Sequence, residues 1–165
     1  MIGAAIRATV LALALAGLLP GLVRAQVEGT PRILDGATLE IAGQRFRLHG
    51  IAVPALDQAC RRAKQEYPCG KVARAALWDL TGGLDVRCLP VPAAAEAGGG
   101  GDAVPATCTA GGTDLNQSMV ETGWALADRT VSEDYVAPEE DAEAAGRGLW
   151  SGEFDLPGTH EPNTE

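Results

Sequence analysis

The sequence predicts a small α+β domain, mainly β, in which five short strands close into a barrel and about three helices cover it. Three observations predict this class. Apolar residues alternate at period two in several short runs, which is typical of half-buried strands. One run changes to the three- and four-residue spacing of an amphipathic helix. The chain has 165 residues, 46% of them hydrophobic and 4% aromatic, which suits one globular domain.

Residues 1–25 have the pattern of a secretory signal. Arg7 ends a short positive head, residues 8–19 are an unbroken apolar run, and small residues before residue 26 offer a cleavage site. The apolar run is shorter than the about 20 residues that span a bilayer. We therefore expect a periplasmic or secreted protein without stable membrane insertion, the alternative being an uncleaved anchor.

The charge after this signal is strongly acidic. Residues 26–165 carry 11 basic against 22 acidic residues, a formal charge of −11. Binding a polyanion needs clustered Lys and Arg that displace counterions. The balance disfavours nucleic acid and favours a protein or saccharide partner, although it does not exclude a small basic groove.

Four cysteines follow the signal, Cys60, Cys69, Cys88 and Cys108. In an oxidising compartment they predict disulfides. Of the three pairings that four cysteines allow, we favour Cys60 with Cys69 and Cys88 with Cys108, because each pair encloses a short segment. No C-x-x-C pair occurs, which argues against a zinc site.

The first strands are expected after residue 30. Period-two apolar positions mark them, at Ile33, at Leu39 and Ile41, and at Phe46 and Leu48. Residues 42–44 form a tight turn between the last two runs, and Asp35-Gly36 forms another that places Asp35 at a strand end.

The second half alternates helices and strands. In order we expect a helix over 70–80 that stops at Gly82-Gly83, a strand over 84–89, a flexible loop over 90–102 and a strand over 104–109. A helix over 115–121, capped by Asp114, and an extended segment over 124–127 are expected next. The last helix is expected within 132–147 and begins near Pro138. Gly148-Leu149-Trp150 closes the domain, which we bound at 26–154. Residues 155–165 are polar and without periodicity, which predicts a disordered tail.

Several motifs in this order resemble the staphylococcal nuclease (thermonuclease) family, in its secreted bacterial branch. They are Asp35-Gly36-Ala37-Thr38-Leu39, residues 45–55 (RFRLHGIAVPA), Cys69-Gly70, Asp114-Leu115-Asn116, Met119-Val120, residues 123–127 (GWALA) and Gly148-Leu149-Trp150. The resemblance runs from residue 30 to residue 150. It implies an OB-fold barrel of five strands.

The resemblance also implies a chemistry whose residues are mostly missing here. In the family, D-G-D-T and R-L-x-G-I-D-A-P-E motifs supply two Asp ligands to a catalytic Ca²⁺ and a Glu that activates water, and two arginines bind the phosphate. The metal ligands fall on Ala37 and Ala52, the Glu on Ala55, and the second arginine near Ala103. Of the direct catalytic positions only Arg47 keeps its residue.

Ca²⁺ takes six to eight oxygen ligands, and a methyl group supplies none. We therefore expect no calcium cofactor, with Asp35 at most a remnant that supports the metal site without touching the ion. Turn chemistry is the simpler role for Asp35, and outward alternation on a strand is the simpler role for Arg47.

Other side chains are interpreted as structural. His49 is expected to be a satisfied strand residue, and the acidic run 133–143 a solvated helix face. Trp78, Trp124 and Trp150 are expected to anchor the core rather than form a ligand platform. No spacing assigns a rescuing role to Glu40, Asp57 or Glu66.

These observations lead to two main hypotheses and to a third possibility, a periplasmic structural or assembly factor. The first is an exported pseudoenzyme that keeps the nuclease fold as a binding or structural module. The alternative is an active secreted endonuclease that hydrolyses DNA or RNA with a rearranged site, built on Arg47 and Asp35 with an acid such as Glu40 or Asp57.

Overall fold

The structure, a computed structural model, describes residues 26–91 and 102–158. Its elements in chain order are β1 (Val27–Gly29), β2 (Arg32–Ile33), β3 (Thr38–Ile41), β4 (Gln44–Leu48), β5 (Ile51–Ala52), β6 (Cys60–Arg62), β7 (Gln65–Tyr67), α1 (Cys69–Thr81), β8 (Val86–Pro90), β9 (Val104–Ala110), β10 (Thr113–Asp114), α2 (Leu115–Glu121), β11 (Leu126–Ala127), α3 (Val136–Ala144) and the 3₁₀ helix η2 (Gly148–Ser151). The predicted class, α+β and mainly β with three α-helices, is confirmed. The predicted signal, most of the predicted loop and residues 159–165 lie outside the described residues.

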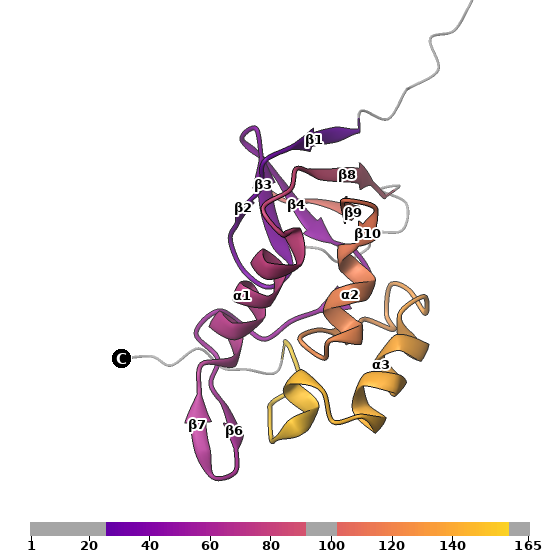
Figure 1. The fold of residues 1–165 in the computed structure, drawn as a ribbon. Helices are drawn as coiled ribbons and strands as arrows, with labels where there is room; N and C mark the ends of the chain where they lie inside the picture. Colours follow the sequence, from indigo (N-terminus) through magenta and orange to yellow (C-terminus); the bar gives the residue numbers. More distant parts are fainter. Residues whose placement is uncertain (1–25, 92–101, 159–165) are drawn as a thin grey trace, which may run out of the picture.

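The main sheet has the strand order β1-β8-β9-β4-β3-β2, with β10 paired to β9 (Figure 1). Neighbouring strands are antiparallel except β4 and β9, which are parallel, with Phe46 opposite Val104. The sheet curls into half a barrel, and a Cβ on Gly29 of β1 would lie only 3.1 Å from the Ile41 side chain of β3. The sheet has seven strands, and the closed five-stranded barrel stays a prediction.

The core follows the period-two pattern of the sequence. Leu39, Ile41, Phe46 and Leu48 are fully buried on β3 and β4. The turn between these strands places Ala42 at φ 50° and Gly43 at φ 82°, the left-handed geometry of a two-residue hairpin loop. The inward side chains therefore come to one face, as the alternation predicts.

The helices close this face. α1 and α2 pack against each other below the sheet in Figure 1, and α3 packs on α2. The α2 cap is confirmed, because the Asp114 carboxylate accepts a hydrogen bond of 3.0 Å from the Gln117 N–H. α3 begins at Val136, which places Pro138 in its first turn, where the missing N–H costs no helical hydrogen bond.

Both predicted disulfides are confirmed. Cys88 and Cys108 face each other across β8 and β9, and Cys60–Cys69 joins the start of β6 to the start of α1. Two such bonds are compatible with an extracytoplasmic location. Among the described residues, no helix is long and apolar enough to cross a membrane.

Several short strands were not predicted, among them β1, β5, β10 and the β6–β7 hairpin. β1 has three residues, too few for an alternation to be recognised, and pairs with β8. The β6–β7 hairpin turns through Ala63 and Lys64, both at positive φ, without the glycine or asparagine that marks such turns. This hairpin projects away from the main sheet at the bottom of Figure 1.

Two expectations about single side chains are wrong. Trp78 is 63% exposed on α1 rather than part of the core, whereas Trp124 and Trp150 do pack against core clusters. Glu139, expected on a solvated face, is 3% exposed. Its carboxylate accepts a hydrogen bond from the Ala127 N–H and pairs with Arg129, because α3 turns this residue toward β11.

Candidate functional site

Most positions that the nuclease resemblance singles out meet at one open pocket of about 270 Å³. Its lining residues are Leu34, Asp35, Ala37, Thr38, Arg47, Val53, Pro54, Ala55 and Leu56. Ala52 and Ala103 are not among them. The turn before β3, the end of β4 and the loop after β5 thus bring four of the predicted positions together.

Asp35 shapes one wall of this pocket as a turn residue. Its Oδ1 accepts hydrogen bonds from the backbone N–H groups of Ala37 and Thr38, each at 2.8 Å. These bonds confirm the predicted turn role and aim that oxygen at the chain itself. The Ala37 methyl group beside it is 2% exposed.

Arg47 stands at the edge of the pocket. It lies opposite Thr38 in the β3–β4 register and is exposed between the buried side chains of Phe46 and Leu48. In the part of the chain that the structure describes, neither a hydrogen bond nor an ion pair holds its guanidinium. Its donors are therefore available to a ligand in the pocket.

The far wall, residues 53–56, rests on the start of α1 at a very short distance. A Cβ on Gly70 would lie 1.7 Å from the Ala55 carbonyl oxygen, so only glycine fits there. A Cβ on Gly36 would lie 2.9 Å from the Ala73 Cβ. Small residues on α1 therefore let both walls come close to the helix.

Gln58 fixes the same wall. It is fully buried, its side-chain oxygen accepts from the Ala55 N–H at 3.2 Å, and its amide nitrogen donates to the Asp155 carbonyl at 2.9 Å. This residue was not predicted as part of the site. A single Gln two residues before a cysteine carries no signal of burial, since glutamine is mostly exposed in proteins.

The residues of this pocket do not fit a calcium ion. Asp35 supplies the one carboxylate, one of whose oxygens is bonded to the turn, and the remaining positions of the metal site carry methyl groups. Ca²⁺ needs six to eight oxygens, largely from carboxylates. Within residues 26–91 and 102–158, no group of three His, Cys, Asp or Glu side chains is arranged to hold a metal ion.

The two positions outside the pocket lie on neighbouring elements. Ala52 belongs to β5, where it pairs with Leu126 of β11. Ala103 precedes β9, whose first residue faces Phe46 of β4. If the parallel register is continued by one residue, position 103 comes level with Arg45, two residues before Arg47 on β4.

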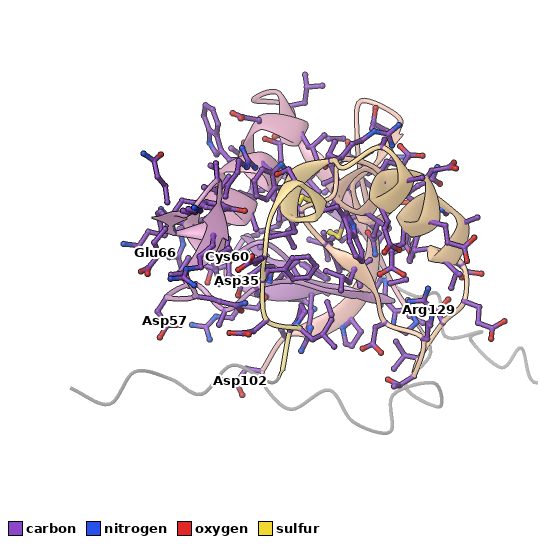
Figure 2. The ribbon with its side chains drawn as sticks, turned by 90° about the horizontal axis from the view of Figure 1, so that it is seen from below. Asp35, Asp57, Cys60, Glu66, Asp102 and Arg129 are labelled. Atoms are coloured by element: carbon purple, nitrogen blue, oxygen red, sulfur yellow. A yellow bond between two sulfur atoms is a disulfide. The ribbon has the colours of Figure 1, made fainter. Side chains whose placement is uncertain are left out.

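The acids weighed as rescuing groups do not line the pocket. Glu40 on β3 receives hydrogen bonds from Arg32, which hold the pKa of its carboxyl below its ordinary value, and it also pairs with Arg45. Asp57 and Glu66 are exposed. Figure 2 shows both on the opposite side of the molecule from Arg129.

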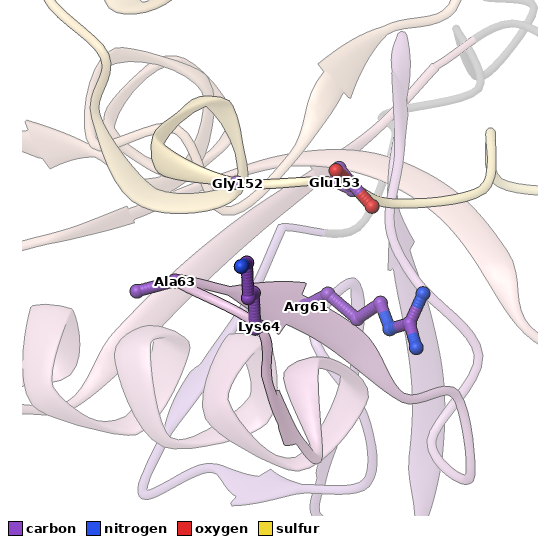
Figure 3. A pocket seen from close by; sticks show the side chains of 5 residues that line it. All are labelled: Arg61, Ala63, Lys64, Gly152 and Glu153. Atoms are coloured by element: carbon purple, nitrogen blue, oxygen red, sulfur yellow. The ribbon is translucent and has the colours of Figure 1, made fainter.

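A second pocket, of about 310 Å³, lies between the β6–β7 hairpin and the segment after η2 (Figure 3). Arg61 and Glu153 exchange two backbone hydrogen bonds of 2.8 Å, and a Cβ on Gly152 would lie 2.0 Å from the Arg61 carbonyl oxygen. Arg61 and Lys64 bring positive side chains to its wall and Glu153 a negative one. The balance of charges gives it no clear ligand preference.

Comparison with known proteins gives a similarity to a curated bacterial protein. No protein-family model matches the chain. The chain is 30% identical over 128 residues to the succinoglycan biosynthesis protein ExoI of Rhizobium meliloti (strain 1021), and the match covers 74% of this chain and 63% of that protein. The chain thus spans less than two thirds of the length of this relative.

Proposed function

We propose that this protein is an exported, non-hydrolysing member of the staphylococcal-nuclease-like OB barrels that acts as a binding module in glycan biosynthesis. The observation that carries the first half is the pocket between Asp35, Ala37, Arg47 and Ala55. It has the position that the resemblance assigns to a nuclease centre, and its residues do not fit the calcium ion on which that chemistry depends.

The chemical consequence is large. In phosphodiester hydrolysis a metal ion stabilises the negative charge that develops on the phosphate, and removing one electrostatic partner costs about 10²- to 10³-fold in rate. Here methyl groups stand at the metal, water-activating and second arginine positions together. Because such groups act as a unit, their losses do not multiply, but a single arginine leaves little of the mechanism.

The proposal that the ligand is a saccharide rests on the similar protein and on the net charge of this chain. The similar protein is a succinoglycan biosynthesis protein by name, so a glycan is the ligand class that the comparison favours. One face of OB barrels binds oligonucleotides or oligosaccharides, and a formal charge of −11 after residue 25, which repels long phosphate chains, favours the oligosaccharide. Two disulfides suit a periplasmic or secreted site of action.

The experiment uses the purified protein from residue 26 onward. It is incubated with single-stranded DNA and with RNA, with and without Ca²⁺, beside an intact nuclease of the family. We expect no digestion above the buffer blank. Calorimetry with Ca²⁺ alone is expected to give no binding heat.

A working nuclease with a rearranged site is the alternative, and one observation favours it: Asp35 and Arg47 share the same pocket. Its prediction is opposite. Calcium-dependent turnover that disappears in Arg47→Ala, and persists in the control Arg87→Ala on β8, would establish the nuclease and overturn the pseudoenzyme.

A further inference from the structure

We infer that the groove between β2 and α1 is a second binding site, which takes an acidic saccharide, with Trp78 under a sugar ring and Arg74 and Arg32 around its carboxylate. The groove is separate from the pocket at Asp35 and Arg47. It has a volume of about 460 Å³ and is lined by Pro31, Arg32, Ile33, Arg74, Ala75 and Trp78. Only the choice of a saccharide rests on the proposed function.

Trp78 is the first observation. Its side chain is 63% exposed, although it belongs to a helix that buries Ala73 and Leu77 completely. An indole ring offers a large apolar face, which folded proteins normally cover. Here that face is left at the wall of a concavity with Pro31 and Ile33, where the C–H face of a pyranose ring can pack against it.

Arg74 is the second observation. It precedes Trp78 by four residues, so both side chains project from one face of α1. Across the described residues, its guanidinium has neither a hydrogen bond nor an ion pair to another side chain. The Arg74 guanidinium, next to an exposed aromatic ring, can therefore donate two parallel hydrogen bonds to a carboxylate of a ligand.

Arg32 faces them from β2, the strand that lies against α1. Its Nε and Nη2 donate to the Glu40 carboxylate at 3.3 and 2.9 Å, which fixes the plane of the guanidinium. A guanidinium has five N–H donors, so donors remain for a ligand. The groove thus has a fixed arginine on one wall and an uncommitted one on the other.

The charge pattern selects the ligand class. The formal charge after residue 25 is −11, yet this groove brings two arginine side chains together. That arrangement suits a small ligand that carries a carboxylate on an otherwise uncharged molecule. A nucleic acid carries many phosphates, which the net negative charge of the protein repels. The groove volume lies within the about 300–1,000 Å³ range of small-molecule sites.

The test titrates the protein from residue 26 onward with trigalacturonate by calorimetry, beside its methyl ester, which has the same rings without charge. We expect trigalacturonate to bind, and the ester to bind at least about tenfold more weakly or not at all. Trp78→Leu and Arg74→Gln should each weaken binding by about tenfold or more, since each removes either the stacking face or a charge-assisted hydrogen bond. Trp78→Tyr, which keeps an aromatic face, should retain most of the affinity.

Lys64→Gln is the matched control, because it removes one positive charge from the exposed turn of the β6–β7 hairpin, outside the groove. Equal binding of acid and ester, or affinity unchanged in Trp78→Leu and Arg74→Gln, would overturn the groove as an acid-binding site. So would the absence of binding to trigalacturonate, or tighter binding of a trinucleotide through the same residues. The digestion experiment decides the pseudoenzyme independently of all these outcomes.

Discussion

Gln58 holds Ala55 from two directions: its backbone N–H donates to the Ala55 carbonyl at 2.9 Å, and its side-chain oxygen accepts from the Ala55 N–H at 3.2 Å. The side-chain amide nitrogen of Gln58 reaches the Asp155 carbonyl. One buried side chain therefore ties a wall of the candidate pocket to the segment that follows η2.

Gln58→Ala is expected to destabilise the protein by about 1–3 kcal/mol, because it removes a fully buried side chain and takes the hydrogen-bond partner from the Ala55 N–H and the Asp155 carbonyl. The measurement is urea unfolding at neutral pH with both disulfides intact. Gln65→Ala on the exposed β7 is the control, and its effect should stay within about 0.5 kcal/mol. Equal stability of the two variants would show that Gln58 does not fix the wall.

Asn116→Asp should be strongly destabilising and dependent on pH. The Asn116 amide nitrogen donates to the carbonyls of His49 and Ala106, at 2.9 and 3.1 Å, and its oxygen accepts from the Cys108 N–H. A carboxylate would turn a negative oxygen toward those two carbonyls in a fully buried place. We expect a loss of about 3 kcal/mol or more at pH 7.

The sign of the pH dependence follows from the same geometry. Burial and the two carbonyls would raise the pKa of the introduced carboxyl above its unfolded value, so the folded state would hold the proton more tightly. Thermal unfolding of this variant should therefore show stability increasing as pH falls from 7 toward 4. Asn116→Ala lacks the carboxyl, and the same rise in that control would contradict the explanation.

The predictable part of the fold was the part with a local pattern. The period-two runs of β3 and β4 and the helical spacing of α1 each bury residues that the pattern selects. The Asp114 cap was likewise visible in the sequence because capping is a contact across three residues. β1 was not visible, because its place beside β8 depends on a pairing between distant segments.

The sequence predicted which positions lie together at the candidate site, but not the second groove. Motif order brought Asp35, Ala37, Arg47 and Ala55 to one pocket, while the groove at Trp78 was not predicted. Helical spacing does not distinguish a tryptophan at the edge of a buried face from one in it. That distinction depends on how β2 and α1 are placed in the fold, which leaves the Trp78 side chain at the wall of a groove.

Because the Tyr135 hydroxyl is buried, we expect the free energy of unfolding to fall at alkaline pH. Its ring is 8% exposed and packs on Gly50, and burial, together with the charges of Asp114 and Asp134, raises the pKa of its hydroxyl to about 12. Between the unfolded pKa near 10 and the folded value, the unfolded state ionises first. Stability present below pH 10 is therefore lost as pH rises toward 12, by an amount on the order of 1–2 kcal/mol.

Tyr135→Phe removes the ionisable group while keeping the ring. Its urea unfolding midpoint should fall less between pH 9 and pH 11 than that of the unchanged protein. Absorbance of tyrosinate should show one of the two tyrosines titrating well above 10 in the unchanged protein. Identical alkaline profiles for the two proteins would exclude Tyr135 as the source.

Restoring the family's acids tests the mapping on which the pseudoenzyme depends. The variant Ala37→Asp, Ala52→Asp, Ala55→Glu and Ala103→Arg should bind Ca²⁺ in calorimetry, because it returns carboxylates to the positions beside Asp35.

Of the four substitutions, Ala37→Asp is expected to lower the stability of the fold most. Ala37 is 2% exposed, so an aspartate there needs the ion to offset its burial, and thermal stability of the variant should rise on adding Ca²⁺. Leu84→Asp, an added acid at an exposed position away from the pocket, is the control and should show no calcium effect. If the quadruple variant is folded and calcium changes neither its heat signal nor its melting temperature, the mapping onto these four alanines is wrong. The pocket would then owe its acid-poor lining to a different ancestry, and Arg47 would lose its comparison with a phosphate-binding arginine.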